Sequence, residues 1–172
     1  IMIFEKPSTR TRISFDIAVK QLGGKSLILN PDEIHYGNGN ESLRDTAKVL
    51  SQYADIVMLR THVHKKVVDF SKYLDIPIIN GLTDLNHPCQ IMSDIMTYEE
   101  LKGPIKNKKI AWLGDGNNIV YSLIEAAVQF DFELSIACPK GYEPNKKIIN
   151  WAKQNNSKIN ITKKALIAAK DA

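Results

Sequence analysis

Three hydroxyl groups and one guanidinium stand side by side near the start of the chain, on Ser8, Thr9, Arg10 and Thr11. They lie where a short apolar strand, predicted over residues 1–4, gives way to a helical pattern. The first turn of a helix has backbone N–H groups without intrahelical partners, and the helix dipole adds about half a positive charge there. One Ser or Thr is enough to cap a helix, so this cluster exceeds what capping needs. We interpret it as a socket for a small dianion, with a phosphoryl group as the expected occupant.

A helix over residues 9–22 must hold this socket. Its apolar positions recur at helical spacing and are Ile13, Phe15, Ile17, Ala18, Val19 and Leu22. Gly23 and Gly24 follow, and glycine commonly ends a helix. We therefore predict a buried helix with a glycine stop, which would make the socket rigid.

Residues 4–11, FEKPSTRT, also resemble a known pattern. The carbamoyl-phosphate signature of the aspartate and ornithine carbamoyltransferases is F-x-[EK]-x-S-[GT]-R-T, and this chain matches it at all six specified positions. The resemblance extends over essentially the whole chain. It implies two substrates, carbamoyl phosphate and an amine such as L-ornithine, and it implies neither a metal nor another cofactor.

Arg60 ends a predicted strand, residues 56–60. Ligands bind at the carboxyl ends of strands in open α/β sheets, so its side chain would emerge at the ligand edge. By itself, a strand-terminal arginine is usually solvated surface. The resemblance implies that Arg10 and Arg60 grip the phosphate as planar, permanently charged forks.

The segment NGLTDLNHPCQ, residues 80–90, follows another predicted strand. A lone histidine in a loop is more often an exposed hydrogen-bonding group, but the proline fixes the backbone while His87 and Gln90 project from a helix start. The segment resembles the HPxQ motif of the family. The resemblance implies that His87 donates a hydrogen bond to the carbamoyl oxygen, together with Arg10 and Thr11, and that Gln90 binds the carbamoyl amide.

The sequence WLGDGNNIV, residues 112–120, places Gly-x-Gly after a strand, as dinucleotide sites do. Position 119, where a third glycine belongs, is Ile, and the next strand ends in Ala137, Cys138 and Pro139 without an acidic residue for a ribose. An NAD-binding domain is therefore a minor alternative. The stretch resembles the GDGNN segment of ornithine carbamoyltransferases, which implies that Asn118 binds the amino-acid end of ornithine.

Three further histidines need an interpretation. His35 lies before a predicted capped helix on a glycine-rich loop, and its counterpart in several relatives reaches the phosphate of a neighbouring subunit. The resemblance thus implies a homotrimer, or a multiple of trimers, with shared sites. His62 and His64 form an H-x-H pair without a third ligand type nearby, so we interpret them as surface histidines.

Composition limits the class of protein. The 172 residues carry a net charge of +4, and much of the excess lies in scattered lysine pairs. This pattern favours a solvated surface over nucleic-acid binding. We expect no membrane segment, because no apolar run approaches the ~20 residues of a span. Two distant cysteines, Cys89 and Cys138, fit a reducing compartment, so we expect a cytoplasmic protein.

Strand and helix patterns alternate seven times, which predicts an α/β fold with two lobes of parallel sheet flanked by helices, the second lobe incomplete. The predicted strands cover residues 1–4, 26–29, 56–60, 77–80, 110–113, 134–137 and 159–162. The predicted helices cover residues 9–22, 42–53, 66–73, 90–100, 119–130, 144–154 and 163–169. A polar break near residues 102–109 predicts a carbamoyl-phosphate-binding domain over 1–102 and a partial ornithine-binding domain over 108–172.

The predicted function is transfer of a carbamoyl group to L-ornithine, giving citrulline and phosphate. Arginine biosynthesis is the expected setting, with arginine breakdown as the alternative. Later family motifs, Asp-x-x-x-Ser-Met-Gly and His-Cys-Leu-Pro, have no counterpart here. The chain also opens without Met, so we expect a piece of a longer protein. Putrescine, acetylornithine or aspartate as acceptor, and a catalytically silent binding protein, remain alternatives.

Overall fold

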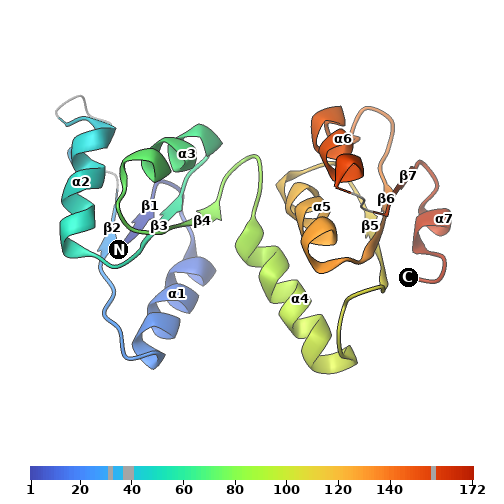
Figure 1. Ribbon diagram of the computed structural model, residues 1–172, viewed down its shortest axis with the longest axis horizontal. Helices are drawn as coiled ribbons and strands as arrows, with labels where there is room; N and C mark the ends of the chain where they lie inside the picture. Colours follow the sequence, from blue (N-terminus) through green and yellow to red (C-terminus); the bar gives the residue numbers. More distant parts are fainter. Residues whose placement is uncertain (31–32, 37–40, 156–157) are drawn as a thin grey trace. The chain divides into compact units, whose positions relative to one another are not determined.

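The computed structural model describes residues 1–30, 33–36, 41–155 and 158–172. Backbone contacts divide the chain into two compact units, Ile1–Asp84 and Leu85–Ala172. Each unit is a parallel sheet flanked by helices (Figure 1), which confirms the predicted fold class.

The first unit contains four parallel strands in the order β2-β1-β3-β4. The strands are β1 (Met2–Phe4), β2 (Ile28–Leu29), β3 (Val57–Arg60) and β4 (Ile78–Leu82). The helices are α1 (Thr9–Gln21), α2 (Leu43–Tyr53) and α3 (His64–Tyr73).

Alternate residues of these strands face opposite sides of the sheet, as the twofold side-chain period requires. On one side, Ile3 and Leu59 belong to the cluster that α2 and α3 cover. On the other side, Phe4 and Met58 form a smaller cluster to which α1 contributes Phe15. The first sheet therefore has one well-covered face and one thinly covered face.

The prediction that α1 is a buried helix is wrong. None of its described residues is buried, and Ile13 and Ile17 are 59% and 45% exposed. The reason is the thin cover on this face, where only Phe15 of the helix packs into a hydrophobic cluster. The predicted stop is present, because Gly23 adopts a φ of 81°, in the region that favours glycine.

The cap predicted for the helix that follows His35 is confirmed at the start of α2, where Ser42 is the N-cap residue. Ser42 Oγ accepts a hydrogen bond from the backbone N–H of Asp45 at 3.1 Å. The same hydroxyl donates to the Asp45 carboxylate at 2.7 Å. The cap satisfies one of the open N–H groups of the first turn.

The second unit begins with helix α4 (Pro88–Lys102) and continues as a three-stranded parallel sheet in the order β5-β6-β7. Its strands are β5 (Lys109–Leu113), β6 (Glu133–Ala137) and β7 (Ile159–Thr162). Its other helices are α5 (Asn118–Phe130), α6 (Lys146–Gln154) and α7 (Ala165–Ala169).

Helix α4 packs within the second unit. Its residues Ile91 and Ile95 share a buried cluster with Val120 and Ile124 of α5. The boundary between the packing units therefore precedes α4, between Asp84 and Leu85. The domain assignment at residues 102 and 108 concerns function, and it stays a prediction.

Candidate functional site

The predicted dianion socket lies at the carboxyl edge of the first sheet. Helix α1 begins after β1, and Arg60 is the last residue of the adjacent strand β3. Parallel strands bring their carboxyl ends to one edge of a sheet, so these two chain segments meet there (Figure 1).

Ser8 occupies the N-cap position of α1 in an extended conformation, with φ −160° and ψ 108°. Within the described part of the chain, its side chain makes no capping hydrogen bond, and the first turn holds no acidic residue. The side chains of Thr9 and Arg10 are exposed. The first turn thus presents hydroxyl and guanidinium groups without a competing carboxylate of its own.

Arg60 and Thr11 are in direct contact, although 49 positions separate them. Arg60 Nη1 donates a hydrogen bond of 3.1 Å to Thr11 Oγ1 and a longer one of 3.4 Å to the carbonyl oxygen of Gly81. The guanidinium of Arg60 therefore lies at the first turn of α1, the turn that also carries Arg10.

A β-bulge, which the sequence analysis missed, lies beside Arg60. The register between β3 and β4 shifts so that Arg60 pairs with Leu82 rather than with Gly81. A Cβ at position 81 would lie 2.4 Å from Met58 Sδ, so a larger residue there would force the Met58 side chain to move. Bulges of this kind redirect side chains at sheet edges. The signal in the sequence was the glycine inside an otherwise apolar strand.

Lys6 of the FEKPSTRT segment belongs to a small charged cluster. Its Nζ lies 3.4 Å from His62 Nδ1 and 3.7 Å from Asp84 Oδ1. His62 Nδ1 in turn lies 3.1 Å from the same Asp84 oxygen. His62 is exposed, as predicted, whereas His64 is only partly exposed and contacts Thr83 Oγ1 at 3.2 Å. His64 is thus less exposed than His62 but still reaches the surface.

His35 is exposed on the short described segment 33–36. Most of the glycine-rich loop predicted to carry it, residues 37–40, lies outside the described residues. A groove of about 310 Å³ lies beside His35, lined also by Glu33, Glu41 and Thr46. The role of His35 toward a neighbouring subunit stays a prediction.

In the second unit, His87 is the N-cap residue of α4, and Pro88 is the first helical residue. Proline suits this position because its missing N–H would have no partner there. The backbone N–H of His87 donates to Ser122 Oγ at 2.8 Å. Ser122, buried in α5, was not predicted; its signal was a polar residue within an apolar helix.

Asn118 begins α5 one turn before Ser122, on the same face of the helix. The N-cap is its neighbour Asn117, whose side chain accepts from the N–H groups of Ile119 and Val120. The start of α4, at His87, is thus bonded to Ser122, one turn after Asn118 in α5. Gln90 is exposed in the first turn of α4, and its amide donates to Asp94 Oδ1 at 2.9 Å.

The Gly-x-Gly loop after β5 is filled by the protein itself. The N–H of Gly116 donates to the carbonyl of Tyr142 at 2.6 Å. A Cβ at Gly116 would lie 2.5 Å from the backbone nitrogen of Pro144. A dinucleotide site needs this backbone to approach the pyrophosphate, and here the loop around residues 142–144 takes that space.

Cys138 follows β6 at the carboxyl edge of the second sheet and is 1% exposed. Burial raises the pKa of its thiol above the ordinary value, and the carboxylates of Glu143 and Asp115 raise it further. A buried thiol with a raised pKa stays protonated at neutral pH, so Cys138 is unsuited to act as a nucleophile.

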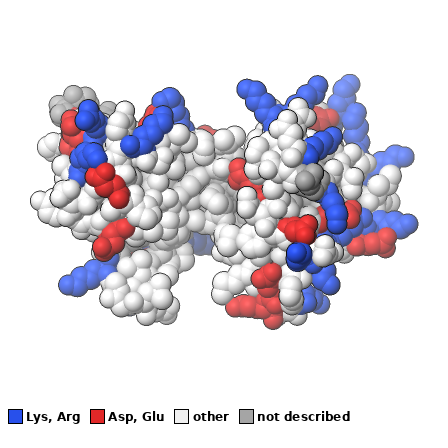
Figure 2. All heavy atoms as spheres, viewed as in Figure 1, with Lys and Arg blue, Asp and Glu red and all other residues white. Residues whose placement is uncertain are grey.

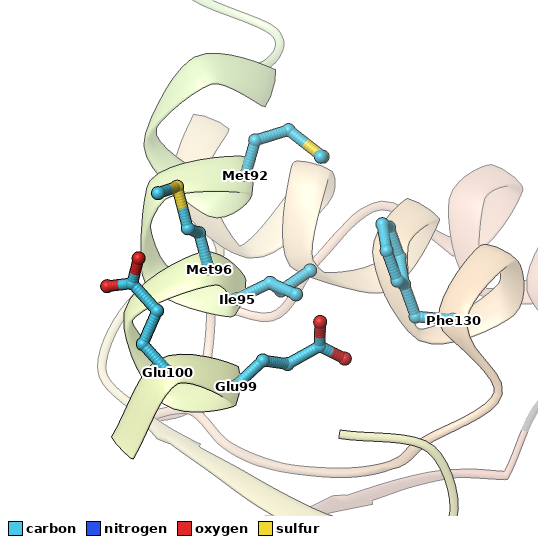
Figure 3. Close-up of a pocket in the computed structure, with 6 residues that line it drawn as sticks. All are labelled: Met92, Ile95, Met96, Glu99, Glu100 and Phe130. Carbon is cyan, nitrogen blue, oxygen red and sulfur yellow. The ribbon is translucent and has the colours of Figure 1, made fainter. Parts of the chain in front are cut away.

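A groove of about 330 Å³ lies between α4 and α5 (Figure 3), and no predicted site residue lines it. Its walls are mainly apolar and come from Met92, Ile95, Met96, Glu99, Glu100 and Phe130. Glu99 is already engaged, because its Oε1 accepts from the backbone N–H of Ile105 at 3.1 Å. This groove lacks the anion-binding groups of the first unit.

Lysine and arginine side chains on the face drawn in Figure 2 are spread over both units and mixed with acidic ones. Across the ranges that the structure describes, no His, Cys, Asp and Glu side chains form a group of three that could hold a metal ion. The helices of those ranges include none that is long and apolar enough to cross a bilayer.

The fold places this chain in the class of proteins that are built from two successive α/β units, each with a parallel sheet. Residues 1–100 match the family description "Aspartate/ornithine carbamoyltransferase, carbamoyl-P binding domain". Residues 106–172 match "Aspartate/ornithine carbamoyltransferase, Asp/Orn binding domain". The chain belongs to the aspartate/ornithine carbamoyltransferase family, as the FEKPSTRT resemblance predicted.

Several relatives are similar over nearly the whole chain. The ornithine carbamoyltransferase of Brucella ovis is 54% identical over 92% of this chain and 50% of its own length. The solved ornithine carbamoyltransferase of Pyrococcus furiosus is 44% identical with a TM-score of 0.92, over 99% of this chain and 56% of its own. The catalytic subunit of the M. jannaschii aspartate transcarbamoylase is 35% identical with a TM-score of 0.80, over 99% and 57%. This chain thus spans about half the length of the curated relatives it matches.

Proposed function

We propose that this protein transfers the carbamoyl group of carbamoyl phosphate to the side-chain amine of L-ornithine, yielding L-citrulline and phosphate. The observation that carries the proposal is the contact between Arg60 and Thr11, because it places a second guanidinium at the helix start that carries Arg10. Two permanent cations, three hydroxyls and open backbone N–H groups suit the phosphoryl group of carbamoyl phosphate.

In this mechanism, the neutral amine nitrogen attacks the carbonyl carbon of carbamoyl phosphate. The new C–N bond forms, the C–O bond to phosphate breaks, and the proton released by the nitrogen passes to the departing phosphate. Thr11, Arg10 and His87 stabilise the oxygen that gains charge in the tetrahedral intermediate. Preorganised donors of this kind contribute about 3 to 4 kcal/mol each in comparable oxyanion sites.

The remaining site residues bind and orient the substrates. Ser8, Thr9, Arg60 and the N-terminus of α1 hold the phosphoryl group and stabilise it as it leaves. Gln90 binds the carbamoyl amide, and Asn118 binds the amino-acid end of ornithine. Most of the rate acceleration then comes from orientation and charge complementarity.

Ornithine is favoured over other acceptors by the names of the similar proteins, which include ornithine carbamoyltransferases at 50% to 54% identity. The GDGNN segment, residues 114–118, supports the same choice. Aspartate is the second candidate, supported by the likeness to the M. jannaschii aspartate transcarbamoylase. We further propose a cytoplasmic homotrimer in arginine biosynthesis in which His35 reaches the site of a neighbouring subunit.

The test is calorimetric titration of carbamoyl phosphate into the protein expressed from its complete reading frame, compared with its Arg10→Ala variant. We expect the variant to bind carbamoyl phosphate about a hundredfold more weakly, because it loses a charged bidentate contact. Equal affinities for carbamoyl phosphate would rule out the proposed site. Citrulline formation with ornithine, but not with aspartate, would then identify the acceptor.

A further inference from the structure

Lys66 lies where three segments of the first unit meet. Its Nζ donates to both carboxylate oxygens of Glu5, at 2.9 Å each. It also lies 5.5 Å from the ring centroid of Tyr36. The hydroxyl of Thr61 donates to the same Glu5 carboxylate at 2.6 Å.

Each of these partners is close in sequence to a predicted site residue. Glu5 belongs to the FEKPSTRT segment, Tyr36 follows His35, and Thr61 follows Arg60. The backbone adds a further tie, because the N–H of Glu5 donates to the Arg60 carbonyl at 2.9 Å. The ammonium group of Lys66 therefore contacts Glu5, in the segment that leads into the predicted phosphate socket, and Tyr36, beside His35. Thr61, beside Arg60, is linked to Lys66 through Glu5.

This arrangement is partly withdrawn from water. The Glu5 side chain is 15% exposed, the Lys66 side chain 35%, and Thr61 only 1%. Tyr36 is held by an edge-on contact with Phe70, with ring centroids 5.2 Å apart. Burial raises the pKa of the Tyr36 phenol, which keeps it neutral beside Lys66. Solvent and salt therefore screen this partly buried pair less than they screen a fully exposed one.

Lys66 compensates the negative charge of Glu5. Glu5 precedes the N-cap residue Ser8 by three positions. A carboxylate this close along the chain to a dianion site lowers the affinity for the ligand unless a cation compensates it. Asp69, the acidic residue of α3, is already paired with Lys65 and Lys72. Lys66 is thus the cation that balances Glu5.

We propose that Lys66 is a positioning and charge-balancing residue for carbamoyl phosphate. It keeps Glu5 from repelling the phosphoryl group while it ties the FEKPSTRT segment to the segment that carries His35. Lys66 itself does not touch the substrate. This inference rests on the proposed function.

The test uses steady-state kinetics of the protein from its complete reading frame, with carbamoyl phosphate as the varied substrate. Lys66→Met leaves Glu5 uncompensated and should raise the KM for carbamoyl phosphate about tenfold, with kcat changed less than about threefold. Lys66→Arg keeps the charge and should stay within about threefold of wild type in both constants. Added salt should narrow the gap between Lys66→Met and wild type.

The matched control removes the charge of Glu5 instead of that of Lys66. Glu5→Gln leaves Lys66 as an unbalanced cation, so its KM should equal that of wild type or fall below it. The double variant Glu5→Gln/Lys66→Met has no net charge in this place and should return to within about threefold of wild type. A purely structural pair would instead make Glu5→Gln as harmful as Lys66→Met, and that result would overturn the inference.

Two failures can be told apart. If wild type binds no carbamoyl phosphate, the proposed function fails. If wild type binds it, Arg10→Ala loses it, and Lys66→Met keeps an unchanged KM, only the role of Lys66 is wrong. Thermal unfolding of each variant shows whether a change in KM accompanies a loss of fold.

Discussion

The two sheets of this chain use their carboxyl edges in different ways. In the first unit, side chains from distant segments meet there, with Arg60 bound to Thr11 and Glu5 bound to both Lys66 and Thr61. In the second unit, backbone fills the edge, because Gly116 packs against the loop at residues 142–144.

This difference shows why a glycine pattern is a weaker indicator than a cluster of hydroxyls and guanidiniums. Gly-x-Gly is consistent with phosphate binding and with tight packing between loops. The hydrogen bond from Gly116 to Tyr142 decides between these alternatives, since a backbone N–H that already has a partner cannot bind a pyrophosphate. Ser8, by contrast, makes no capping hydrogen bond with the described residues, although it stands at an N-cap.

The largest effect, on kcat/KM, should come from removing Arg60 from the carboxyl edge of the first sheet. Arg60→Ala removes the guanidinium that contacts Thr11, so kcat/KM in the proposed reaction should fall about a hundredfold to a thousandfold. Steady-state assay of citrulline measures this loss. Arg44→Ala, which removes an exposed arginine from α2, is the matched control and should leave kcat/KM unchanged. Equal effects of the two substitutions would remove Arg60 from the site.

A smaller effect, on stability, should come from disturbing the packing of Gly116 at the carboxyl edge of the second sheet. Gly116→Ala forces a methyl group to within 2.5 Å of Pro144 and 2.8 Å of Glu143 backbone atoms. Overpacking against backbone should lower the free energy of unfolding by about 3 kcal/mol. Urea denaturation measures the change.

Gly103→Ala is the control for that experiment, because its Cβ would meet nothing within 4 Å. It should cost only about 1 kcal/mol, from a φ of 79° that disfavours alanine. If Gly116→Ala lowers the free energy of unfolding no more than Gly103→Ala does, the loop at residues 142–144 does not fill the space beside Gly116. A titration with a dinucleotide would then test the alternative of a dinucleotide site.

The smallest effect should come from Ser122→Ala. It leaves the N–H of His87 without the acceptor seen at 2.8 Å, which should lower the free energy of unfolding by about 1 kcal/mol. Thermal denaturation detects a change of this size. Ser93→Ala is the control, because the Ser93 hydroxyl is exposed and bonds only to the Cys89 carbonyl of its own helix. A Ser122→Ala variant as stable as the control would show that this bond does not fix the start of α4.

Most of the fold could be predicted from the sequence because hydrophobic periodicity determines the elements of an α/β protein. All seven predicted strands and all seven predicted helices are present, with ends that differ by a few residues at most. The position of Arg60 at a strand end also followed from this pattern. Candidate site residues such as Arg10 could be predicted because their residue type and their place at a helix start are both given by the sequence.

The remaining features depend on contacts between distant segments. The bulge at Gly81 lies in the pairing of β3 with β4, and the role of Ser122 arises from packing of α5 against the start of α4. The exposure of Ile13 and Ile17 in α1 depends on what covers one face of the sheet. Periodicity indicates which side of a helix is apolar, but not whether that side is covered.

The most direct test of the central claim is a crystal structure of the protein from its complete reading frame with carbamoyl phosphate bound. We predict phosphoryl oxygens about 3 Å from the guanidinium groups of both Arg10 and Arg60, at the first turn of α1. A phosphoryl group bound at the Gly114–Gly116 loop instead, or bound with Arg60 turned away from it, would contradict the account.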